Sequence, residues 1–177
     1  SAGRLTVDLD ALVRNYRQLK AKAGPSRCAA VVKANAYGLG IDPIVGCLSD
    51  DGCQHFFVAT LAEGLQLRSL LERAEIFVFA GPLPGDEAAF RAARLTPVLN
   101  SHEQVVRWIA CADAERYPSI VHIDTGMTRL GLDRRELNQI ALDSAVTERL
   151  KIAYVMTHLA CADRPGNLMN QEQIDRF

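Results

Sequence analysis

The sequence predicts an α/β fold of the (β/α)8, TIM-type, barrel class, of which this chain supplies about six of the eight units. Short apolar runs alternate with amphipathic segments over short connections, which is typical of parallel βαβ units. The runs are apolar almost throughout, as in strands buried on both faces. Polar side chains collect where the runs end, at Lys33, at residues 124–129 and at His158. Barrel enzymes place their chemistry at such strand ends.

A doubly wound nucleotide-binding sheet is the alternative within this class. It favours a GxGxxG loop after the first strand, and Gly38-Leu39-Gly40 matches that pattern poorly. We therefore favour the barrel. Because a closed barrel needs eight units, we expect the chain to be a fragment of a longer barrel.

The first predicted element is a short strand at residues 5–7, and a helix capped by Asp8 follows and ends at Gly24-Pro25. Apolar runs then predict six strands, at residues 28–33, 55–60, 75–80, 96–99, 119–124 and 151–157. Helical spacing predicts further helices over 41–48, 60–73, 86–95 and 168–177, and two that begin after Ser101 and Asp133. Capping boxes are expected at Thr60/Glu63, Ser101/Gln104 and Asp133/Glu136.

Lys33 is the first candidate for chemistry. It follows an apolar run, whereas the other three lysines, Lys20, Lys22 and Lys151, lie in polar surroundings. Packing around a lysine lowers its pKa and makes the amine nucleophilic, as a Schiff-base lysine requires. The alternative is a lysine whose charged end reaches solvent from a strand end.

Composition argues against several classes of protein. The net charge is −1 with both signs interspersed, so no nucleic-acid footprint or polybasic membrane patch is expected. No apolar run approaches the ~20 residues of a membrane span. The five cysteines form no CxxC pair, which indicates reduced thiols in the cytoplasm. A zinc site from Cys47, Cys53 and His55 matches no standard spacing.

The segment VVKANAYGLG, residues 31–40, resembles the pyridoxal phosphate (PLP) motif of alanine racemases. The resemblance implies that Lys33 holds PLP covalently and that Tyr37 binds its phosphate. The segment DTGMTRLG, residues 124–131, resembles a second motif of the same family, which implies that Arg129 approaches the phenolic oxygen of PLP and that Met127 lies near the substrate. The segment THLACAD, residues 157–163, resembles a third, which implies that His158 lies close to the pyridine ring.

His122 departs from the family pattern. Many members have a lysine at this place, modified to a carbamate that holds the arginine. A histidine forms no such carbamate, although a neutral one can accept a hydrogen bond from Arg129. A buried histidine without a role is the alternative.

The resemblance implies that residues 5–177 are the N-terminal part of the PLP-binding barrel, without the later strands and the C-terminal β-domain. The implied activity is PLP-dependent conversion of L-alanine to D-alanine, for peptidoglycan precursors, by a cytoplasmic homodimer. Because the family's second base is a tyrosine of the C-terminal domain, we expect this chain alone to be inactive. Alternatives are a PLP-binding module without catalysis, a serine or broad-specificity racemase, and a barrel without PLP.

Overall fold

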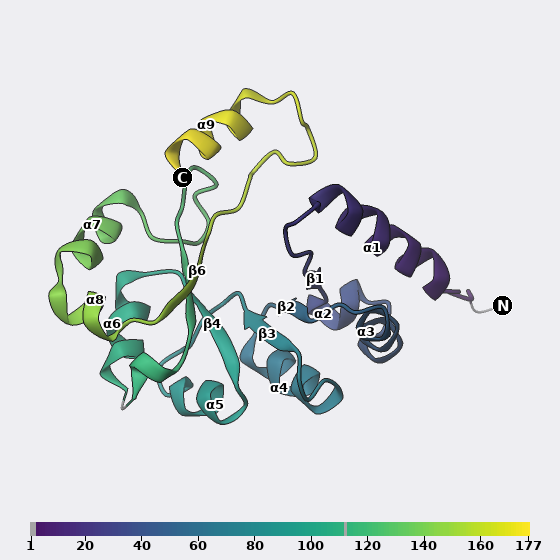
Figure 1. Cartoon of the computed structure of the whole chain (residues 1–177), viewed down its shortest axis with the longest axis horizontal. Coiled ribbons are helices and arrows are strands. Elements are labelled where there is room, and N and C mark those ends of the chain that lie inside the picture. Colours follow the sequence, from purple (N-terminus) through teal and green to yellow (C-terminus); the bar gives the residue numbers. More distant parts are fainter. Residues whose placement is uncertain (1–2, 112) are drawn as a thin grey trace. The chain divides into compact units, whose positions relative to one another are not determined.

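The computed structural model describes residues 3–111 and 113–177, and Figure 1 shows the whole chain. The chain divides into two compact units, residues 1–78 and 79–177. Each unit contains parallel strands that follow one another in chain order and are connected by helices. Both units therefore have the βαβ construction expected from the alternation of apolar and amphipathic segments.

The first unit holds three strands in the order β1-β2-β3, all parallel. Its elements are α1 (Leu9–Ala23), β1 (Ala30–Val31), α2 (Lys33–Tyr37), α3 (Ile41–Asp50), β2 (His55–Val58), α4 (Leu61–Leu70) and β3 (Glu75–Val78). Inward-facing side chains of the strands and helices, including Phe56, Val58, Ile76, Val78 and Leu67, are fully shielded from solvent. Burial of these apolar groups is the main driving force for folding of this unit.

The second unit holds β4, β5 and β6, again parallel and in chain order. Its elements are α5 (Glu87–Ala92), β4 (Leu95–Leu99), α6 (His102–Ala110), the 3-10 turn η1 (Ala114–Arg116), β5 (Ser119–His122), α7 (Arg134–Leu142), α8 (Ser144–Arg149), β6 (Ile152–Met156) and α9 (Leu168–Arg176). Its core contains Trp108 packed edge-to-face on Phe90, with ring centroids 6.3 Å apart.

The helix starts follow the predicted chemistry with one exception. The Asp8 cap and the capping boxes Thr60/Glu63 and Asp133/Glu136 are present. Ser101 accepts a hydrogen bond from the Gln104 amide, but the Gln104 side chain accepts from the amide of Asn100 instead of completing a box. The predicted box at Ser101 is therefore only half formed.

Two strand predictions need correction. Residues 5–7 form no strand, because within the described chain no other strand pairs with them. The strand predicted at 28–33 is reduced to Ala30–Val31, although the amide of Val32 still donates to the carbonyl of Phe57 at 2.9 Å. Lys33 thus begins the turn after β1 rather than ending the strand.

The outer edge of β6 is open in the described part of the chain. β6 pairs with β5 only, and Ile152, Tyr154 and Val155 are 49%, 40% and 46% exposed. Such an edge can accept another strand. Among the helices built from described residues, none has both the length and the apolar character required to span a membrane.

Candidate functional site

The turn that contains Lys33 is left-handed. Ala34, Asn35 and Ala36 have φ of 53° and ψ of 49–50°, and Tyr37 has φ of 55°. These are left-handed helical values, which cost residues with a Cβ roughly 1–2 kcal/mol each. Strain of this kind persists only where the surroundings impose it, and it concentrates at functional sites.

Side chains from within and beyond the turn hold it in place. Glu63 at the start of α4 accepts a hydrogen bond from the amide of Ala34 at 2.8 Å, while its other oxygen accepts from the amide of Ala59 at 2.6 Å. The side-chain oxygen of Asn35 accepts from the amide of Ile41 at 2.8 Å. Hydrogen bonds therefore connect the left-handed turn to α4 through Glu63 and to the start of α3 through Asn35.

Lys33 and Tyr37, one turn apart, lie together on this segment. The Lys33 Nζ is 5.9 Å from the centroid of the Tyr37 ring, a cation–π distance. Lys33 is half-buried, and Tyr37 is 64% exposed. The first unit thus presents an amine and a phenol side by side, just beyond the carboxyl end of β1.

In the second unit, the loop after β5 is organised by the carboxylate of Asp124. One of its oxygens accepts from the amides of Gly126 and Thr128 at 2.9 and 3.0 Å. Burial alone would raise the pKa of Asp124, but these backbone donors, together with the amide of Met127, lower it below its ordinary value. The loop leaves Met127 half-buried and Arg129 exposed.

His122, at the end of β5, is buried and makes one defined polar contact. Its Nδ1 lies 2.8 Å from Oδ1 of Asn100. The Asn100 amide nitrogen donates to the carbonyls of Phe79 and Val98, at 2.8 and 3.0 Å, which fixes Oδ1 as the atom facing the ring. Nδ1 must therefore carry the proton, and Nε2 keeps its lone pair while the ring is neutral.

The surroundings of this ring disfavour its protonated form. Burial is the largest cause that lowers the pKa of His122, and the positive charges of His158 and Arg129 act in the same direction. The carboxylate of Asp124 opposes them. In the second unit, the sequence candidates His158 and Arg129 thus lie close enough to His122 to lower its pKa.

A pH dependence of stability follows. The folded pKa of His122 lies below the unfolded value of about 6.5, so the unfolded chain binds more protons as pH falls through that value. The free energy of unfolding should therefore fall between pH 7.5 and 5.5. Urea unfolding should show a smaller fall in His122→Gln than in the unchanged chain or in the control His102→Gln. Equal falls in all three would contradict this account.

His158 follows β6 and is exposed, but its main chain is held by α9. The carbonyl of His158 accepts from Nε2 of Gln173 at 2.9 Å. Nearby, the hydroxyls of Thr125 and Thr157 lie 2.7 Å apart and join the loops after β5 and β6. These contacts were not predicted from the sequence, because a glutamine on a mostly polar helix gives no sign of burial.

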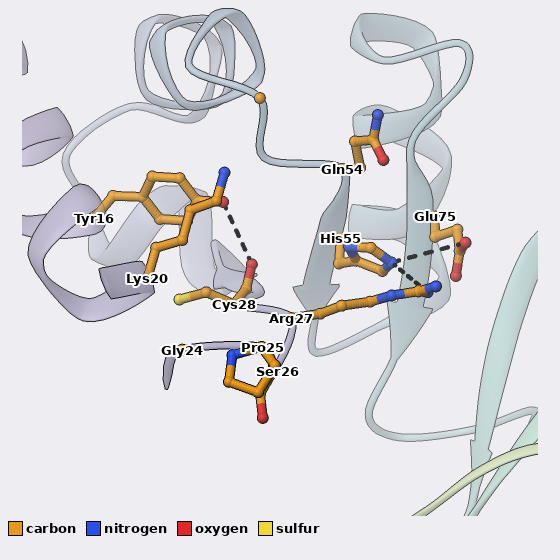
Figure 2. Close-up of a pocket in the computed structure, with 11 residues that line it drawn as sticks. Tyr16, Lys20, Gly24, Pro25, Ser26, Arg27, Cys28, Gln54, His55 and Glu75 are labelled. Atoms are coloured by element: carbon orange, nitrogen blue, oxygen red, sulfur yellow. Dashed lines mark hydrogen bonds and ion pairs between the residues drawn. The ribbon is translucent and has the colours of Figure 1, made fainter. Parts of the chain in front are cut away.

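A separate hollow of about 430 Å³ lies near the amino ends of the first unit's strands (Figure 2). Figure 2 shows Arg27 reaching His55, which in turn approaches Glu75; the distances are 3.3 Å and 3.8 Å. The Tyr16 hydroxyl donates to the carbonyl of Cys28 at 3.4 Å. Because these groups satisfy one another, and barrel chemistry sits at the opposite strand ends, we assign this hollow a structural role.

Cys47, Cys53 and His55, whose spacing matches no standard zinc pattern, are not grouped as metal ligands in the described chain. Sγ of Cys53 donates to the carbonyl of His55, and Sγ of Cys47 donates to that of Ile44. Within residues 3–111 and 113–177, no group of three or more His, Cys, Asp or Glu side chains is placed to hold a metal ion.

Comparison with known families decides the relationship. The model of the alanine racemase N-terminal domain matches residues 7–177. The chain belongs to the alanine racemase family. Its fold is the α/β barrel type of that domain, as predicted.

Individual members of the alanine racemase family agree with this assignment. An alanine racemase of Rhizobium meliloti is 44% identical over all of this chain and 47% of its own length. A catabolic alanine racemase of Agrobacterium fabrum is 46% identical over 98% of this chain and 46% of its own length. The crystal structure of the Bartonella henselae alanine racemase, with covalently bound pyridoxal phosphate, is 36% identical and superposes with a TM-score of 0.90 over 96% of this chain and 50% of that one. The chain spans about half the length of these relatives.

Proposed function

We propose that the protein containing this chain is a PLP-dependent racemase of alanine. The observation that carries the proposal is the half-buried amine of Lys33, held at a strand end by a strained left-handed turn. A related alanine racemase carries covalently bound pyridoxal phosphate on the same fold. A nucleophilic amine at such a place is what attachment of an aldehyde cofactor requires.

The residues present fit the chemistry of PLP. Lys33 supplies the amine for covalent attachment, and the adjacent Tyr37 supplies a phenol donor for the phosphate. In the second unit, Arg129 supplies a guanidinium for the phenolic oxygen, and His158 an imidazole for the ring. We propose that Met127, two residues before Arg129, contacts the substrate. When bound, PLP supplies an electron sink that acidifies the Cα–H bond of the amino acid.

Racemisation requires removal of the α-proton from one face and delivery of a proton to the other. We propose that the Lys33 amine exchanges the proton on one face. The group for the other face is proposed to lie outside this chain, which spans about half of its relatives' length. On this proposal residues 5–177 are the N-terminal part of the PLP barrel, and the 177-residue chain alone does not racemise alanine.

The setting of the enzyme is part of the proposal. Its free cysteines and its net charge of −1 support a cytoplasmic protein. We propose a homodimer, and D-alanine for peptidoglycan precursors as its product. The exposed strand β6 is proposed to receive the next barrel strand of the longer protein.

The activity is tested in the longer protein. Chiral chromatography should show interconversion of L- and D-alanine, and Lys33→Ala should reduce it by at least about 10⁴-fold, because both cofactor attachment and one proton transfer are lost. Lys22→Ala, on the exposed face of α1, is the control and should leave the rate unchanged. Parallel assays with serine identify a broader specificity. Persistent turnover in Lys33→Ala would overturn the assignment of Lys33.

A further inference from the structure

Gln173 is a fully buried polar side chain on a helix that is otherwise largely exposed. Its exposed fraction is 0%, whereas its neighbours Glu172 and Ile174 in α9 face solvent. Glutamine is rarely buried to this extent unless its amide is hydrogen-bonded. The side chain therefore has a defined set of partners.

Both ends of the Gln173 amide are used, and they reach two different loops. The nitrogen donates to the hydroxyl of Thr125 at 3.1 Å, in the loop after β5, and to the carbonyl of His158 at 2.9 Å, in the loop after β6. The oxygen accepts from the amide of Ala160 at 2.8 Å. One side chain thus fixes the main chain on both sides of Leu159 and joins it to Thr125.

Two more side chains of α9 act on the same loops. Asn170 and Arg176 lie three residues before and after Gln173, so all three share one face of the helix. Asn170 donates to the carbonyl of Cys161 at 3.0 Å, and Arg176 donates to the carbonyl of Thr125 at 3.0 Å. All three side chains therefore bond to these loops, and of the three only Gln173 is fully buried.

An apolar side chain of similar size would fill the same volume, but the amide of Ala160 and the carbonyl of His158 would each lose the bond to Gln173, while the Thr125 hydroxyl would retain its contact with Thr157. Each buried donor or acceptor without a partner costs roughly 1–3 kcal/mol. Hydrogen bonding, and not side-chain volume, therefore favours glutamine at this position. The two loops that it connects carry three of the residues proposed above for the cofactor and substrate, Met127, Arg129 and His158.

We propose that Gln173 is a positioning residue of the enzyme: it sets the place of the His158 main chain relative to the Thr125–Arg129 loop. The functional meaning of this role rests on the proposed PLP site, and His158 is the residue through which Gln173 acts. Gln173 holds the main chain of His158 in place whether or not a cofactor is bound.

The test uses the 177-residue chain without PLP, and NMR as the readout. Gln173→Met keeps the side-chain volume and removes all three bonds. Thr125→Val removes the bond between Gln173 and Thr125, together with the contact between the Thr125 and Thr157 hydroxyls, and keeps the two bonds of Gln173 to the main chain of His158 and Ala160. Gln173→Met should accelerate hydrogen exchange of the Ala160 amide by about tenfold or more and shift the His158 ring resonances. Thr125→Val should shift the His158 resonances without exposing the Ala160 amide.

Gln171→Met is the matched control, because Gln171 is exposed on the same helix and its side chain donates to Asp175, away from the two loops. It should leave both signals unchanged. Unchanged His158 resonances in both test variants, or equal shifts in the control, would overturn the proposal. Addition of PLP then separates the two claims: lack of PLP attachment in the unchanged chain argues against the proposed function, whereas the NMR result stands without it.

Discussion

Gly131→Ala should destabilise the second unit by about 2–4 kcal/mol, a large effect on stability for a single substitution. Gly131 has φ of +112°, where side chains are strained, and an added Cβ would lie 2.8 Å from the Asp124 amide nitrogen and 3.0 Å from the Ile123 carbonyl carbon. Both contacts are with backbone, which has no room to move because Leu132 donates to the carbonyl of His122 at 2.7 Å. The substitution must therefore displace the loop that carries Arg129.

Urea unfolding followed by fluorescence of Trp108, the chain's one tryptophan, measures this effect within the second unit. Gly166→Ala is the matched control, since an added Cβ there meets no atom within 4 Å. It should change stability by less than about 0.5 kcal/mol. Similar midpoints for the two variants would show that the loop adapts and that Gly131 is not required.

Glu63→Ala should release the left-handed turn after Lys33. The carboxylate accepts from the amides of Ala34, Ala59 and Thr60, at 2.8, 2.6 and 3.3 Å. A hydrogen bond to a charged acceptor contributes about 1.5–3 kcal/mol, and here it also opposes the strain of four residues at positive φ. Hydrogen exchange of the Ala34 amide should therefore accelerate by about ten- to a hundredfold.

The control for Glu63→Ala is Gln66→Ala, which alters an exposed side chain one turn further along α4. It should leave exchange at Ala34 unchanged. When PLP is added to the protein, Glu63→Ala should also slow attachment at Lys33, because the amine loses its fixed position. An Ala34 amide that stays equally protected in Glu63→Ala would mean that Asn35 and α3 hold the turn by themselves.

Most elements of the fold were predictable because their signals are local. Apolar runs located the six strands of the described chain, and caps at Asp8, Thr60 and Asp133 located helix starts. The strand expected at residues 5–7 failed because a strand needs a partner, which a short apolar run does not guarantee. The prediction of a complete capping box at Ser101 was wrong, because the Gln104 side chain accepts a hydrogen bond from the amide of Asn100 instead.

The roles of the candidate site residues remain predictions. Lys33, Tyr37, Arg129 and His158 were identifiable from the sequence because they lie in motifs. Their supporting residues were not. Asn100 and Gln173 act across 22 and 15 residues of sequence, on His122 and on the carbonyl of His158, and no spacing rule connects them. Glu63 was predicted as a capping residue, but its second contact, with Ala34, depends on how α4 packs beside the turn.

The most direct test of the account is to mix the protein with PLP, reduce it with borohydride and map the modified peptide by mass spectrometry. The account predicts a pyridoxyl group on Lys33, lost in Lys33→Ala and retained in Lys22→Ala. Modification spread over Lys20, Lys22 and Lys151, or no modification at all, would contradict the claim that the turn after β1 is a cofactor site.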